Sequence, residues 1–273
     1  MNWALYAQDE FDILHNLILS AGLRHDHYSG FGGPTNPRLG LIYHPFHPTT
    51  LKLLYGSAFH APEPFEIRPD FAFFENNLQL RPETIHSVEA VVEQTLGHRF
   101  KLSGTVFQNR IEGLITLDTD NNNGRSVYRN SEKAYALGMG LELDGRLPGG
   151  LETTASYGYT DAEDAVTHKP LSNAPRQLAK LNLAAPFMRK RFLASVNAQY
   201  TSPRLSLAGN YVSGFATFNT TLLAHTLGKH MDFSASVYNL LDKKYFDPGR
   251  PEDPEDAIQQ DGRNFRIKLT GRF

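Results

Sequence analysis

The sequence of 273 residues contains no cysteine. This excludes disulfides, thiolate metal ligands and a cysteine nucleophile. Basic charge is not in excess either, because 27 Lys and Arg residues stand against 29 Asp and Glu residues, so we expect no nucleic-acid partner. Mean hydropathy is −0.40, and no apolar run approaches the roughly 18 residues of a membrane helix. Strands that cross a membrane as a β-barrel are not excluded, because alternating strands barely register in hydropathy.

Targeting and catalytic motifs are also lacking. The first residues, MNWALYAQD, have neither a basic region nor an uninterrupted apolar run, so we expect no signal peptide in this sequence. No nucleophile elbow, phosphate-binding loop or dinucleotide fingerprint occurs. We therefore predict that the protein is not an enzyme and needs no cofactor.

What the sequence does contain is alternation of period two, which is typical of β-strands. At the carboxy end, polar residues alternate with the apolar residues Phe265, Ile267, Leu269 and Phe273. Similar alternation occurs around Val196 and Phe233. We count about thirteen such strands and no helical stripe, and we predict an all-β, antiparallel fold.

The connections between these strands fall into two alternating kinds. Short turns are expected at 9–12, 44–48, 96–99, 147–150, 186–189 and 227–230. Long polar loops are expected at 26–36, 60–81, 112–133, 161–175, 202–213 and 246–261. Short turns at one end and long loops at the other are typical of outer-membrane barrels, whose short turns face the periplasm.

A soluble sandwich or propeller would also give alternating strands. The polar faces of the predicted strands, however, carry charges at mid-strand: Arg24, Lys52, Lys101, Glu142, Glu152, Lys180, Arg266 and Lys268. Slipping the last strand by one residue would place Arg266 and Lys268 in lipid, at a cost of about 2 to 4 kcal/mol each. We therefore predict a transmembrane barrel whose apolar side chains face lipid.

Five segments, in order along the chain, then resemble motifs of TonB-dependent outer-membrane receptors. They are NPRLG at 36–40, GSAFHAP at 56–62 followed by LRPE at 80–83, FQNRIEGLI at 107–115, VYNLLDKKY at 237–245 and the terminal Phe273. Each match alone is weak, but together they cover nearly the whole chain.

The resemblance implies a barrel of about 22 strands in the outer membrane of a Gram-negative cell, occluded by a plug. It implies uptake of a ferric siderophore, haem or cobalamin, powered by the TonB complex. Residues 1–273 correspond to a single carboxy-terminal barrel segment without a plug, and we expect a fragment or truncated form. The alternative is a passive, porin-like barrel that closes on itself. The barrel-assembly machinery would read Phe265, Ile267, Leu269 and the aromatic last residue, Phe273.

Ligand contact is expected in the two longest loops. Their aromatic and guanidinium side chains suit bulky, anionic iron complexes: Arg68, Phe71, Phe73, Phe74, Arg125, Tyr128 and Arg129. His60, which replaces the arginine of the motif at 56–62, joins this set. The alternative is that the aromatic residues only pack on one another.

No metal site is expected. The segment 118–124 resembles the start of a calcium loop, but its glycine falls one place late and Arg129 stands at the twelfth position, where the loop requires glutamate.

Overall fold

The computed structural model describes residues 1–30, 32–119, 124–188, 191–224, 231–250 and 253–271. They form two compact units, one of residues 1–92, 105–138 and 161–171, the other of 93–104, 139–160 and 172–273. Among the described residues, no helix is long and apolar enough to span a membrane.

Fourteen strands form one sheet, and thirteen of them follow one another in the order β1-β2-β3-β4-β6-β7-β8-β9-β10-β11-β14-β15-β18. Their bounds are β1 (Asn2–Leu14), β2 (Leu17–Tyr28), β3 (Thr35–Phe46), β4 (Thr49–His60), β6 (Glu83–Leu96), β7 (Phe100–Thr119), β8 (Ser126–Arg146), β9 (Glu152–Asp164), β10 (Gln177–Phe187), β11 (Phe192–Thr201), β14 (Phe215–Ala224), β15 (Met231–Tyr238) and β18 (Asn264–Gly271). The number and all-β character of the predicted strands are confirmed.

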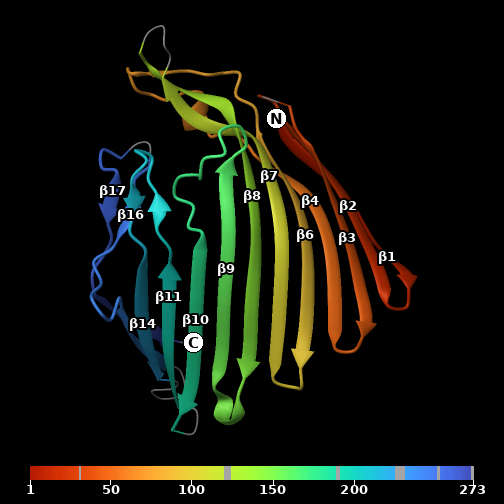
Figure 1. The fold of residues 1–273 in the computed structure, drawn as a ribbon, viewed down its shortest axis with the longest axis vertical. Coiled ribbons are helices and arrows are strands. Elements are labelled where there is room, and N and C mark those ends of the chain that lie inside the picture. The colour runs from red at the N-terminus through yellow and green to blue at the C-terminus, as the bar shows by residue number, and fades with distance from the viewer. Residues whose placement is uncertain (31, 120–123, 189–190, 225–230, 251–252, 272–273) are drawn as a thin grey trace. The chain divides into compact units, whose positions relative to one another are not determined.

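Smaller elements lie in the connections between these strands. These are α1 (Pro64–Ile67), β5 (Phe74–Glu75), the 3-10 turn at Pro148–Gly150, β12 (Arg204–Leu205), β13 (Tyr211–Val212), β16 (Phe246–Pro248) and β17 (Ala257–Gln259). β12 pairs with β13, β16 pairs with β17, and β5 runs parallel to β8. Tight turns join the hairpins β1–β2 and β3–β4, which lie side by side (Figure 1).

In the register of the sheet, apolar side chains of neighbouring strands lie opposite one another and form rows across the strands. In the first unit, Leu41 lies opposite Leu19 of β2 and Leu53 of β4. In the second unit, Ala235 lies opposite Leu222 of β14 and Ile267 of β18. Apolar side chains on these rows stay exposed, and Ile267 has 73% of its surface in solvent. A sheet face this apolar and this exposed needs lipid or another apolar surface to cover it.

Three predicted connections are wrong. The turn at 9–12 is strand, because β1 continues to Leu14 and Phe11 pairs with Leu19, so the turn falls at 15–16. The loop at 26–36 shrinks to 29–34, since β2 runs to Tyr28. Most of the predicted loop at 112–133 is also strand, because β7 reaches Thr119 and β8 starts at Ser126. Acidic and polar residues in these segments are typical of loops, but strand ends that lie in water tolerate the same residue types.

Two further predictions, the turn at 227–230 and the terminal Phe273, lie outside the described residues. Phe265, Ile267 and Leu269, the other members of the predicted assembly signal, all lie on β18 and are exposed.

Candidate functional site

The connection 61–82 between β4 and β6 is tied to the strands beside it by side-chain hydrogen bonds. Asn77 Nδ2 donates to the Tyr128 carbonyl oxygen at 2.8 Å. Glu83, the last residue of the LRPE motif, accepts a bond from the Ile115 backbone N–H at 2.7 Å. The motif therefore fixes the start of β6 against β7.

A short parallel pairing extends this attachment. Phe74 and Glu75 of β5 lie opposite Ser126 and Val127 of β8, and the Ser126 N–H donates to the Phe73 carbonyl oxygen at 3.0 Å. β8 thereby provides a backbone hydrogen-bond partner for this part of the connection. Its aromatic side chains are held at the end of the β7–β8 hairpin.

These side chains form one aromatic cluster, which consists of Phe65, Phe71, Phe73, Phe74 and Tyr128. Ring centroids of Phe71 and Phe73 are 5.7 Å apart and stacked, and those of Phe74 and Tyr128 are 6.1 Å apart and stacked. Phe65 meets Phe71, Phe74 and Tyr128 edge-on. Such distances are typical of favourable aromatic pairs.

The cluster has a buried base and an open top. Tyr128 is buried, whereas 64% of the Phe73 surface and 53% of the Phe71 surface is exposed. Packing among the rings, which the sequence left as an alternative to ligand contact, therefore does occur. It leaves Phe71 and Phe73 exposed, while Tyr128 contacts Phe65 and Phe74 at the base of the cluster.

A pocket of about 660 Å³ adjoins the cluster, and Arg125 lines it together with Phe71, Phe74, Asp70 and Glu75. It combines ring faces, one guanidinium and two carboxylates. Of the predicted ligand residues, the structure thus brings together Phe71, Phe73, Phe74, Arg125 and Tyr128.

The other predicted residues lie elsewhere. His60 Nδ1 is 3.4 Å from Glu83 Oε2, so this histidine faces the LRPE glutamate. Arg68 is exposed at the end of α1, where its backbone N–H donates to the Pro64 carbonyl oxygen at 3.0 Å. Arg129 is exposed on β8. Sequence reasoning missed Phe65, although it stands in the same connection as the three predicted phenylalanines.

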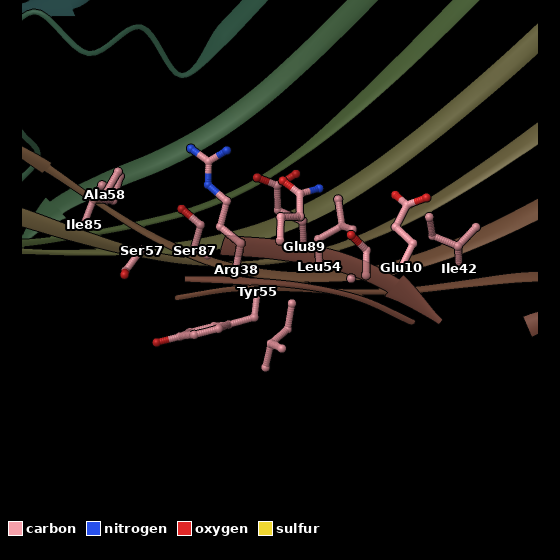
Figure 2. A pocket seen from close by; sticks show the side chains of 16 residues that line it. Glu10, Arg38, Ile42, Leu54, Tyr55, Ser57, Ala58, Ile85, Ser87 and Glu89 are labelled. Carbon is pink, nitrogen blue, oxygen red and sulfur yellow. The ribbon is translucent and has the colours of Figure 1, made fainter. Parts of the chain in front are cut away.

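A second pocket opens on the polar face of the first unit and was not predicted. It measures about 520 Å³, and side chains of β1, β3 and β6 line it, including Glu10, Arg38 and Glu89. Arg38, Ser87 and Glu89 project to one side of the sheet, and Tyr55 projects to the other (Figure 2). Alternation had marked polar faces but could not show which strands bring these residues together.

In the second unit, Arg204 connects three loops. Its guanidinium forms an ion pair with Asp247, and it donates to Asn173 Oδ1 at 3.1 Å and to the Phe246 carbonyl oxygen at 3.2 Å. The Phe215 ring lies 5.7 Å from its Cζ. With only 10% of its side chain exposed, Arg204 has a structural role.

Asp256 makes a second link between loops of this unit. It accepts bonds from Ser206 Oγ at 2.7 Å, Asn210 Nδ2 at 3.0 Å and the Ala208 N–H at 3.1 Å. Hydrogen bonds from Asn210 and Ser206 hold the pKa of this carboxyl below its ordinary value, because they stabilise the charged form. The loops 202–214 and 239–263 are therefore joined before any ligand binds.

A sequence profile described as "TonB dependent receptor-like, beta-barrel" matches residues 1–240. The chain belongs to the TonB-dependent receptor family. This confirms the resemblance and the transmembrane barrel fold class predicted from sequence. The receptor family and the exposed apolar face together assign the chain to the outer membrane. The family consists of receptors and transporters, not enzymes.

Several curated proteins are similar to this receptor chain. The iron-regulated outer membrane virulence protein of Vibrio cholerae is 26% identical over 296 residues, covering 99% of this chain and 44% of the relative. The ferric enterobactin receptor of Pseudomonas aeruginosa is 23% identical over 315 residues, covering 99% of this chain and 42% of the relative. The chain thus spans less than half the length of these relatives.

Solved structures share the fold. A crystal structure of the ferric enterobactin receptor of Pseudomonas aeruginosa superposes with a TM-score of 0.80 at 21% identity, over all of this chain and 45% of the other. The siderophore receptor PirA of Acinetobacter baumannii gives 0.79 at 17% identity, over all of this chain and 46% of the other.

Proposed function

We propose that this chain forms part of a receptor that takes up a ferric siderophore, or a similarly scarce nutrient such as cobalamin, across the outer membrane. The TonB complex would supply the energy. The barrel-assembly machinery would insert the strands, reading the exposed row Phe265, Ile267 and Leu269 and the terminal Phe273. Membership of the receptor family over residues 1–240 is the observation that carries this proposal.

The aromatic cluster supports the same function. Phe71 and Phe73 present two stacked, exposed rings beside a pocket that Arg125 lines. Ring faces and a guanidinium suit a bulky complex with aromatic and anionic parts. The names of two relatives agree, since one is iron-regulated and another is a receptor for ferric enterobactin.

The strand order argues against a passive barrel that closes on itself. In the part of the chain that the structure describes, thirteen strands follow one another from β1 to β18, and neighbouring antiparallel strands alternate in direction. The first and the thirteenth therefore run the same way and would have to pair in parallel, whereas bacterial outer-membrane barrels of one chain have an even number of antiparallel strands.

Deletion of the gene in the source organism tests the proposal. Iron-starved cells are given radioactive iron as a catecholate, hydroxamate or citrate complex or as haem, and separately radioactive cobalamin. We expect uptake of one of these compounds to fall to background and the others to be unchanged. Unchanged uptake of all five compounds would contradict the proposal.

Point variants in the chromosomal gene then test the cluster. Replacing Phe71 and Phe73 by alanine should raise the KM for the transported compound about fivefold, since an aromatic contact contributes about 0.5 to 1.5 kcal/mol. Leu78→Ala is the matched control, because Leu78 is an exposed apolar residue of the same connection and is not aromatic. Equal effects of the two changes would exclude the cluster from ligand binding.

A further inference from the structure

Two histidines share the apolar face of the sheet near the end of β2. His25 and His27 are two residues apart, so strand alternation places their side chains on one face, about 6.6 Å apart along the strand. Arg24 and Asp26 alternate with them, bond to each other and line a pocket on the polar face. The two imidazoles therefore have no charged neighbour from their own strand on the apolar face.

β2 is paired on both of its edges at this point. In the register of the sheet, His27 lies opposite Trp3 of β1, and His25 lies opposite Leu5 of β1 and Thr35 of β3. None of these three neighbours is charged. The pair lies away from the tight turn that joins β1 to β2 (Figure 1). Because short turns face the periplasm in outer-membrane barrels, the pair lies at the external end of the strand.

The Trp3 indole contacts both imidazole rings. Its centroid is 5.2 Å from that of His27, with the two rings stacked at 22°, and 5.4 Å from that of His25. Stacking covers the face of a ring, whereas the nitrogens of imidazole lie on its edge. The contact therefore restrains both rings and leaves their nitrogens uncovered.

A hydrogen bond orients His25 further. His25 Nδ1 is 2.9 Å from Thr35 Oγ1. In the tautomer whose Nδ1–H donates to this hydroxyl, Nε2 carries the lone pair that can bind a metal ion. Histidines that ligate metals usually engage their second nitrogen in this way. His27 has no hydrogen-bond partner among the residues that the structure describes, so its nitrogens are not engaged there.

We propose that His25 and His27 form a two-histidine site for a divalent transition-metal ion, with Cu²⁺ as its preferred ion. Imidazole suits copper, nickel and zinc, and among these divalent ions the affinity of a nitrogen site is highest for Cu²⁺. No group of three or more metal-ligating side chains occurs in the described part of the chain, so the protein supplies two nitrogens and water supplies the other ligands. The site lies on the face opposite the polar pockets and does not depend on the proposed uptake function.

Thr35 acts in this site as a positioning residue. It touches His25 and not the ion, and its hydroxyl restrains the ring from the neighbouring strand. Loss of such an outer hydrogen bond typically lowers metal affinity about 10- to 100-fold.

Copper titration of the detergent-solubilised full chain tests the site. Trp3 is the only tryptophan of the sequence, and bound Cu²⁺ quenches indole fluorescence at short range, so the titration reports on this location. We expect saturable quenching. His25→Phe and His27→Phe, which keep a ring beside Trp3 but remove the nitrogens, should each raise the Kd about 100-fold, at least as much as loss of an outer hydrogen bond.

His86→Phe is the matched control. It removes a histidine from β6, in the same unit, and should leave the Kd for Cu²⁺ unchanged. An unchanged Trp3 emission maximum in the two β2 variants without metal would show that they fold as the unaltered chain does. No saturable quenching of the unaltered chain, or equal Kd values for all variants, would overturn the proposal.

Electron paramagnetic resonance of the copper-loaded chain counts the ligands. The spectrum of the unaltered chain should show coupling to two imidazole nitrogens, and His27→Phe should reduce this to one. Coupling to a single nitrogen in the unaltered chain would contradict the two-histidine site. Zn²⁺ should displace Cu²⁺ only in excess, and tighter binding of Zn²⁺ would overturn the assignment of copper as the preferred ion.

The role of Thr35 has its own readout. Thr35→Val should raise the Kd for Cu²⁺ about tenfold, and Thr35→Ser, which keeps the hydroxyl, should restore it. Equal Kd values for the valine and serine variants would contradict the positioning role.

Discussion

Asn130 and Arg81 exchange two hydrogen bonds. The Arg81 backbone N–H donates to Asn130 Oδ1 at 2.8 Å, and Asn130 Nδ2 donates back to the Arg81 carbonyl oxygen at 2.8 Å. Asn130 Nδ2 also donates to the Gly113 carbonyl oxygen at 2.7 Å. One side chain of β8 thus holds the connection just before β6 and the β7 backbone at Gly113, whose φ is +69°.

Replacing this amide should loosen the attachment of the connection 61–82. Asn130→Ala removes three hydrogen bonds, and we expect the free energy of unfolding to fall by about 2 kcal/mol, since each such bond contributes about 0.5 to 1.5 kcal/mol and water replaces part of the loss. Denaturant titration of the chain in lipid vesicles measures it. Gln79→Ala, which changes an exposed side chain in the same connection, should lower the free energy of unfolding by less than 0.5 kcal/mol. If both variants lower it equally, Asn130 does not hold this connection in place.

Arg204 should be needed for order in three loops. Arg204→Ala leaves Asp247 and Asn173 without their hydrogen-bond donor, and we expect a cost of about 2 kcal/mol, since hydrogen bonds to charged groups contribute about 1.5 to 3 kcal/mol and the Asp247 side chain is 39% exposed. Hydrogen exchange should increase in 165–176 and around Phe246 and remain unchanged in β10. Arg250→Ala, an exposed arginine in the loop 239–263, is the control and should leave exchange unaltered.

The hydrogen bonds that the Asp256 carboxylate accepts should be lost at acidic pH. Its native pKa is below the ordinary value near 3.9, so its bonds stabilise the loops above that pH, and the stabilisation is lost as pH falls through the lowered native pKa. Because the chain has no cysteine, a spin label at Leu207→Cys reports this loop alone. Label mobility should rise below about pH 4.

Two controls define that experiment. Asp256→Ala should make the label at 207 mobile at every pH tested. A label at Met188→Cys, in the turn after β10, should show no step in acid. If the mobility of the label at 207 still rises in acid in the Asp256→Ala variant, a group other than Asp256 causes the transition.

The apolar face should not tolerate charge. Ile267→Lys on β18 should destabilise the chain in lipid vesicles by about 2 to 4 kcal/mol, because Ile267 projects from the apolar face. Lys268→Gln, one residue along on the polar face, should change stability by less than 1 kcal/mol. Equal effects would contradict the assignment of the apolar face to lipid.

Strands were predictable where alternation was complete. In β18, Phe265, Ile267 and Leu269 alternate with polar residues, so sequence alone indicated both strand and face. In β7 and β8, Gly113 and a run of polar residues interrupted the pattern. The sequence beyond Gly113 therefore predicts a loop, whereas β7 continues to Thr119 and β8 starts at Ser126.

The candidate sites were predictable only as residue types. Phe71, Phe73, Phe74 and Tyr128 could be selected as aromatic residues of predicted long loops, but the parallel pairing of β5 with β8 that gathers them has no local pattern. The pocket that Glu10, Arg38 and Glu89 line depends on strand register, which places Gly56 opposite Arg38 and which a single sequence does not determine.

The most direct test of active uptake is the dependence of transport on TonB. Iron-starved cells of the source organism, with and without this gene and with and without a functional TonB complex, are given the radioactive compound whose uptake the deletion abolishes. We predict transport against a gradient only when both gene and TonB are present. Uptake that requires the gene but continues without TonB would contradict the account and assign the chain to a passive channel.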